Sequence, residues 1–102
     1  MWCGIPTYVV DTLSHIAFYD GQSISLRVDF FSLAPLKQIF VYAHECGHHV
    51  HRSSNEADAD CFAVQIGRDQ GWLSREEALE ICRSDWTYWG EKRCQHWMSC
   101  YD

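Results

Sequence analysis

A short run near the middle of the chain, residues 44–48, carries the residue types of a zinc site. It reads His-Glu-Cys-Gly-His. Four residues on an α-helix turn by about 400°, so His44 and His48 lie about 40° apart on one face, one turn from each other. Two imidazoles at this spacing can bind one zinc ion, and Glu45 beside them can reach a water molecule at the metal without being a ligand. Chance gives roughly 0.02 such matches for this composition, so the run favours zinc binding.

A zinc site needs more than two imidazoles, because catalytic zinc has three protein ligands and a water. The next acidic cluster is residues 56–60, Glu-Ala-Asp-Ala-Asp, which follows the polar break at 53–55. Glu56 and Asp60 are four residues apart, so they share one face of a helix. Such a cluster is also typical of a solvated helix N-terminus, where the helix dipole favours acidic side chains.

An antiparallel helical hairpin would bring this acidic cluster to the histidines. If the chain turns near residue 52, His48 is level with Glu56. By the same count, His44 is level with Asp60. We therefore predict that Glu56 is the third zinc ligand and that Asp60 orients a histidine by accepting its free ring N–H. The exchanged assignment, with Asp60 as the ligand, stays open.

The elements that must position these residues follow from hydrophobic patterning. Short β-prone runs, the turn signal Asp20-Gly21 and an alternation of apolar and polar residues predict a small sheet of about three strands. The strands are expected at 7–10, 16–19 and 24–30. Pro35 suits the first turn of a helix that continues to about His51. Its predicted apolar stripe is Leu36, Ile39, Phe40, Ala43 and Val50.

Three further helices are predicted after the metal-binding run, which makes the fold class α+β. One extends from Ala57 to Ile66 and ends near Gly67. The next opens with the capping box formed by Ser74 and Glu77 and runs to about residue 83. A fourth, irregular helix is expected over 86–98.

Length and charge limit the classes of function. The chain has 102 residues and a formal net charge of −6. We expect a single domain over residues 1–102 with one modest core. No clustered basic residues are present to neutralise phosphates, so a nucleic-acid partner is not expected. No apolar run approaches the ~20 residues that span a bilayer. A monomer without a membrane span is expected.

Six cysteines in so small a chain favour disulfides over free thiols. This cysteine content predicts a secreted or periplasmic protein, although the first four residues show no signal peptide. Six cysteines allow 15 pairings, and the sequence does not choose among them. Cys46 with Cys61 is one candidate pair, and Cys82 with either Cys94 or Cys100 is another.

The two motifs together resemble those of the gluzincin zinc metallopeptidases. The run from His44 to His48, followed by Glu56 to Asp60, is similar to the H-E-x-x-H plus E-x-x-A-D pattern of the HtpX-like and neutral zinc metallopeptidase families. The resemblance covers about residues 36–66. It implies a minimal zincin-like fold, with a small sheet, an active-site helix and a glutamate helix. It also implies that an extended peptide substrate pairs with the strand expected at 24–30.

The same resemblance implies a role for each residue of the site. His44, His48 and Glu56 would bind one Zn²⁺ ion, Glu45 would be the general base, and Asp60 would support a histidine. In the implied reaction, zinc acidifies a water and polarises a carbonyl, and Glu45 passes the proton of the water to the leaving amine. The oxyanion also needs a donor besides zinc, and the candidates are Tyr88, His96 and Tyr101.

The leading hypothesis is therefore a zinc-dependent metallopeptidase that acts on a peptide or protein substrate. A zinc-stabilised, disulfide-rich binding or inhibitor module without turnover is the alternative. An open fourth coordination position would distinguish the enzyme from the module, in which a protein side chain would close it. Metal-dependent hydrolysis of a non-peptide amide is a third option.

Overall fold

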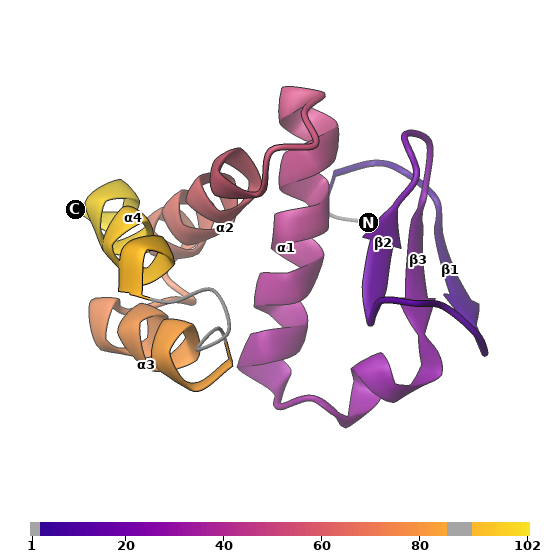
Figure 1. The fold of residues 1–102 in the computed structure, drawn as a ribbon, viewed down its shortest axis with the longest axis horizontal. Helices are drawn as coiled ribbons and strands as arrows, with labels where there is room; N and C mark the ends of the chain where they lie inside the picture. Colours follow the sequence, from indigo (N-terminus) through magenta and orange to yellow (C-terminus); the bar gives the residue numbers. More distant parts are fainter. Residues whose placement is uncertain (1–2, 86–90) are drawn as a thin grey trace.

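The computed structural model describes residues 3–85 and 91–102 and has an α+β fold, as predicted. Three strands and a short 3₁₀ helix precede four α-helices in the described chain (Figure 1). The first group is β1 (Thr7–Val10), β2 (Ala17–Tyr19), β3 (Ile24–Arg27) and η1 (Val28–Ser32). The helices are α1 (Pro35–His51), α2 (Glu56–Gln70), α3 (Arg75–Asp85) and α4 (Glu91–Tyr101). The predicted start of the fourth helix, at residue 86, lies outside the described residues.

The sheet is mixed, and β3 is its middle strand. β1 pairs with β3 in parallel, and β2 pairs with β3 antiparallel. The predicted turn between β2 and β3 is confirmed, since an Asp20 carboxylate oxygen accepts from the backbone N–H groups of Gln22 and Ser23, each at 2.8 Å. With a partner on each side, β3 has no free edge. The expectation that this strand pairs with substrate is therefore wrong for this arrangement.

The predicted strand over 24–30 is wrong beyond Arg27, where the chain enters η1. The partner strands end at this level, because the last paired residues of β3 are Leu26 on the β2 side and Arg27 on the β1 side. The Arg27 guanidinium then pairs with Asp29 at 2.6 Å. This turn leaves Val28 half exposed and buries Phe30. The alternation of the sequence thus continues into a segment that has no strand to pair with.

Helix α1 stands between the sheet and the other helices and divides the core in two (Figure 1). Phe40 and Ala43 pack into a helical cluster with residues of α2, α3 and α4. Cys46 belongs to the other cluster, which is built on the sheet. The expectation of one core is therefore wrong. Two members of the predicted apolar stripe, Ile39 and Val50, are exposed, because the buried surface surrounds the middle of the helix rather than following one stripe.

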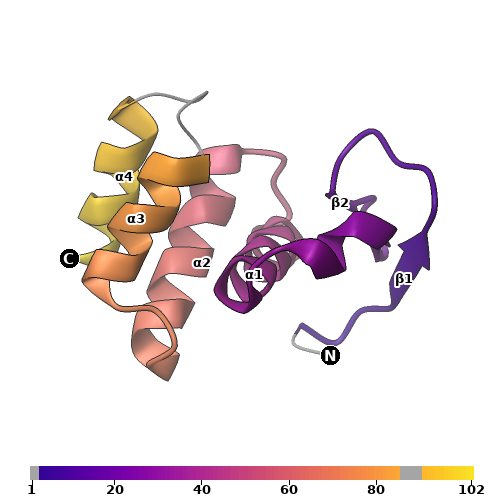
Figure 2. The ribbon, with the colours of Figure 1, turned by 90° about the horizontal axis from the view of Figure 1, so that it is seen from below.

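Helices α1 and α2 cross steeply instead of forming the predicted antiparallel hairpin. In Figure 2, α1 is seen nearly along its axis, whereas α2 lies across the view. The chain turns at Arg52, whose left-handed backbone (φ 49°) ends α1. The helices approach closely at Gly47, where an added Cβ would lie 2.9 Å from the Cα of Ala59. Glycine at this point lets the two backbones come together.

Two of the predicted helix ends can be compared directly with the structure. The expected end of α2 near Gly67 is wrong, because the helix continues to Gln70 and is capped by Gly71, which has a positive φ of 81°. Gly67 serves close packing instead, because a Cβ there would lie 2.7 Å from the Leu73 side chain. The predicted capping box of α3 is confirmed, since the Ser74 and Glu77 side chains each accept from the other's backbone N–H.

All six cysteines are paired, in three disulfides. Cys3 pairs with Cys46, so the expected pairing of Cys46 with Cys61 is wrong. Of the two partners considered for Cys82, the structure has Cys94. The third disulfide joins Cys61 to Cys100, so α4 is bound covalently to both α2 and α3. Within residues 3–85 and 91–102, no helix has the length and apolar character needed to cross a bilayer.

Replacement of Gly47 by alanine should force α1 and α2 apart. The added methyl meets backbone atoms of Ala59, which cannot rotate away. We expect the free energy of unfolding to fall by about 1–2 kcal/mol, because the overpacking outweighs the gain in helix propensity. Denaturant titration would measure this change, with the exposed-site variant Val50→Ala as the control. A Gly47→Ala protein as stable as the parent would show that the helices do not need this close approach.

Candidate metal centre

His44 and His48 belong to α1, and their buried rings face Glu56 at the start of α2. The Nδ1 of His44 donates to Oδ1 of Asp60 at 2.8 Å. The Nδ1 of His48 donates to the backbone carbonyl of Ser53, also at 2.8 Å. With both Nδ1 atoms held in this way, each ring presents its Nε2 to the space between the helices.

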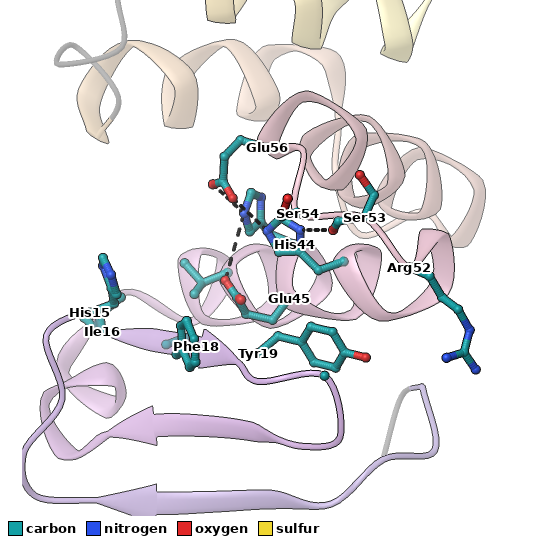
Figure 3. A pocket seen from close by; sticks show the side chains of 14 residues that line it. His15, Ile16, Phe18, Tyr19, His44, Glu45, Arg52, Ser53, Ser54 and Glu56 are labelled. Atoms are coloured by element: carbon teal, nitrogen blue, oxygen red, sulfur yellow. Dashed lines mark hydrogen bonds and ion pairs between the residues drawn. The ribbon is translucent and has the colours of Figure 1, made fainter.

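Glu56, the first residue of α2, faces both of these nitrogens (Figure 3). Its Oε2 is 3.1 Å from Nε2 of His44, and its Oε1 is 2.8 Å from Nε2 of His48. Each of the three residues offers a ligand atom, and these atoms all lie within 4.8 Å of one another. His44, His48 and Glu56 could therefore hold a metal ion.

The start of α2 is fixed by local hydrogen bonds, which place Glu56 opposite the histidines. The Asn55 side chain caps the helix by accepting from the backbone N–H groups of Ala57 and Asp58. Before it, the backbone N–H of Ser53 bonds to the carbonyl of His48 and closes the turn after α1. The polar break in the sequence is thus a tight connection that brings the acidic cluster to the histidines.

The histidines and carboxylates of the centre stabilise each other's charged forms. Burial opposes protonation of His44, but its hydrogen bonds to Asp60 and Glu56 outweigh this and raise its pKa to about 9. The bond to Glu56 also raises the pKa of His48. Conversely, the two histidines hold the pKa of Glu56 well below its usual range. Without a metal, the centre therefore binds protons where a cation would otherwise lie.

Glu45 lies next to the three ligand candidates but is not one of them. Its Oε2 is 3.9 Å from Nε2 of His44 (Figure 3), and its carboxylate accepts a hydrogen bond from the Tyr19 N–H on β2. Burial raises the pKa of this carboxyl, although the nearby histidines and a hydrogen bond from the backbone N–H of Tyr19 act against the rise. Glu45 is therefore a proton acceptor placed on the sheet side of the centre.

A pocket of about 760 Å³ opens over the centre, between α1 and β2. One wall consists of residues 15–19, and the other includes Val41, Glu45 and both histidines. The Glu56 side chain is half exposed, so the ligand candidates face the pocket instead of being sealed within the protein. A small molecule or a peptide segment can reach them from this side.

Asp60 lies on the far side of His44 from the pocket and is fully buried. Besides accepting from His44, it accepts from the Nε and Nη2 of Arg93 and from the Nε1 of Trp97, the last at 2.7 Å. Burial disfavours the charged form of Asp60, but His44 and Arg93 outweigh it and lower the pKa of the carboxyl. Neither Arg93 nor the bond from Trp97 was predicted, because no local spacing pattern relates the residues of α4 to residues 44–60.

Two of the three residues considered for oxyanion stabilisation, His96 and Tyr101, lie away from the pocket. The Tyr101 hydroxyl donates to the carbonyl of Leu73, and His96 contacts the carbonyl of Ala57. Neither residue lines the pocket, and Tyr88 lies outside the described residues. His96 also lies near Cys61 and Cys100, but their sulfurs are joined in a disulfide, so this second group offers no thiolate to a metal.

Comparison with protein families, with curated proteins and with solved structures finds no match to this chain.

The metal-free protein should lose stability as the pH rises from about 6.5 to about 9. The folded-state pKa of His44 is raised from 6.5 to about 9, so its contribution is complete below pH 6.5 and is lost as the pH passes the raised value. Denaturant unfolding in the presence of a chelator, at pH 6 and pH 9.5, would measure the loss. A His44→Gln variant should show a smaller loss. Equal or greater stability of the parent chain at pH 9.5 would contradict the raised pKa.

Proposed function

We propose that this protein is a zinc-dependent metallopeptidase with a single zinc ion held by His44, His48 and Glu56. The convergence of two imidazole Nε2 atoms on one carboxylate beside an open pocket carries the proposal. The ligand atoms of the three side chains all lie within 4.8 Å of one another, so one ion could contact all three. This donor set is one that zinc accepts, and it agrees with the resemblance to gluzincins.

Glu45 is the general base and proton carrier of the proposed reaction. Zinc, when bound, supplies Lewis acidity that makes water a better nucleophile and polarises a carbonyl. The Glu45 carboxylate accepts a proton from the attacking water and then donates it to the amine nitrogen that leaves. A carboxylate suits both steps, because it can hold the proton between them. The Asp60 carboxylate meanwhile holds the ring of His44 in place.

An extended peptide is the substrate class that the pocket favours. β2 pairs with β3 on one side only, and its other edge borders the pocket. The Ile16 carbonyl accepts from Arg27 of β3, so the alternate residues Ala17 and Tyr19 direct their backbone groups to the other edge, where Glu45 already accepts from the Tyr19 N–H. A peptide that adds to this edge by strand pairing would pass directly beside Glu45. β2 thus takes the role first expected of the strand at 24–30.

The open pocket favours an enzyme over a structural zinc module. Within the described residues, the group around His44 contains three ligand side chains and no fourth, and Glu56 is half exposed. A structural zinc site is usually closed by four protein ligands. The three disulfides are compatible with an extracellular protein, and we propose secretion or export to the periplasm.

Glu45→Gln should abolish peptide hydrolysis but leave zinc binding intact. The amide keeps the size of the side chain and can still accept from Tyr19, but it cannot carry the proton, so we expect a loss of activity of about 10²- to 10⁴-fold. Elemental analysis and turnover of a quenched fluorescent peptide library would measure both properties. Full activity in this variant would rule out Glu45 as the base.

His48→Ala should lose zinc, because only two of the three ligands would remain. His51→Ala is the matched control, since His51 lies on the same helix outside the ligand group and packs its ring against Phe62. The control should retain one zinc ion per chain in the elemental analysis. Stoichiometric zinc in dialysed His48→Ala would show that the ion binds elsewhere.

A further inference from the structure

Arg93 of α4 reaches both carboxylates that α2 directs toward the histidines. Its Nε and Nη2 donate to the two oxygens of Asp60, the latter at 2.8 Å. The same Nη2 lies 3.8 Å from Oε2 of Glu56. The guanidinium side chain is only 9% exposed, so solvent screens these charge pairs weakly. The Arg93 guanidinium therefore contacts both Asp60, which holds His44, and Glu56, which is one of the ligand candidates.

The geometry of the guanidinium group explains why arginine is suited to this location. Its planar fork can donate two parallel hydrogen bonds to one carboxylate and still direct an edge toward a second carboxylate. Lysine carries the same charge on a single nitrogen, so it cannot hold both carboxylates in fixed orientations. Glu45, Glu56 and Asp60 also place three acidic groups around His44, and Arg93 offsets part of their repulsion.

We infer that Arg93 is a positioning residue of the metal centre, which holds Asp60 against His44 and restrains the carboxylate of Glu56. The inference rests on the proposed zinc site and adds to it a residue from a helix that contributes no ligand. Trp97, one turn further along α4, assists by donating to Asp60 while its ring stacks on Phe40 at 4.3 Å between centroids. Loss of the Arg93 fork should therefore weaken metal binding, although every ligand remains.

Arg93→Lys tests this role while it keeps the positive charge. Competition with a chromogenic chelator would measure zinc affinity, and we expect a loss of about 10- to 100-fold, as is typical of residues that orient metal ligands. The Co²⁺-substituted protein should also show a shifted visible absorption band, because the coordination of the metal changes. Trp97→Phe, which keeps the stacked ring and removes the donor, should weaken zinc binding in the same direction but less.

Arg68→Lys is the matched control, because Arg68 also joins α2 to α4. Its guanidinium donates to the backbone carbonyls of Cys100 and Tyr101, away from the centre. A role limited to clamping the two helices would make both lysine variants alike, with equal losses of thermal stability and unchanged Co²⁺ spectra. We expect the Arg68→Lys protein to keep the parent spectrum and the parent zinc affinity.

Two results would overturn the inference, and they have different meanings. If the parent chain binds zinc and cleaves peptides, but Arg93→Lys keeps the same affinity and spectrum, the role of Arg93 is wrong and the proposed function stands. If the parent chain takes up neither zinc nor Co²⁺, the metal site itself is wrong, and the role of Arg93 with it. Free-thiol titration of each variant would show that the disulfides, and hence the attachment of α4, are intact.

Discussion

The buried carboxylate of Asp60 is the constraint on which the arrangement of the helices depends. A charge with no exposed surface is costly unless hydrogen-bond donors replace the water that it loses. The donors come from α1 and α4, through His44, Arg93 and Trp97, while Asp60 itself belongs to α2. Three helices must therefore meet at one point, and apolar packing alone would not specify that point so narrowly. The orientation of His44 follows from this network.

The neighbouring residues of the motif on α1 impose a second constraint, because they must face different partners. His44 and His48 face α2, whereas Glu45 turns toward the Tyr19 N–H on β2 and Cys46 joins the sheet-side cluster. A helix that uses both sides in this way has to lie between two layers. This requirement accounts for the divided core and for the buried residues all around the middle of α1. The pocket lies between β2 on the sheet side and the histidine face of α1.

The structure brings the predicted ligand candidates together, but not in the predicted antiparallel hairpin. Glu56 and Asp60 lie within four residues of Ala59, where α2 meets Gly47, and so the steep crossing and the predicted antiparallel pairing bring the same side chains together. Further from Gly47 the steep crossing and the antiparallel pairing would place different residues side by side. The end of β3 could not be predicted from its own residues, because it is set by where the partner strands β1 and β2 stop pairing. Gly67 resembled a helix end because close packing and a left-handed turn both select glycine.

Arg93 was beyond the reach of sequence reasoning for a different reason. Its partner Asp60 is 33 residues away, and no local periodicity reports contacts at that separation. Two disulfides attach α4 to its neighbouring helices. Cys94 follows Arg93 directly and is bound to α3 through Cys82, while Cys100 is bound to α2 through Cys61. With both disulfides formed, Arg93 and Trp97 face Asp60, so the covalent links and the buried hydrogen bonds hold α4 in the same position.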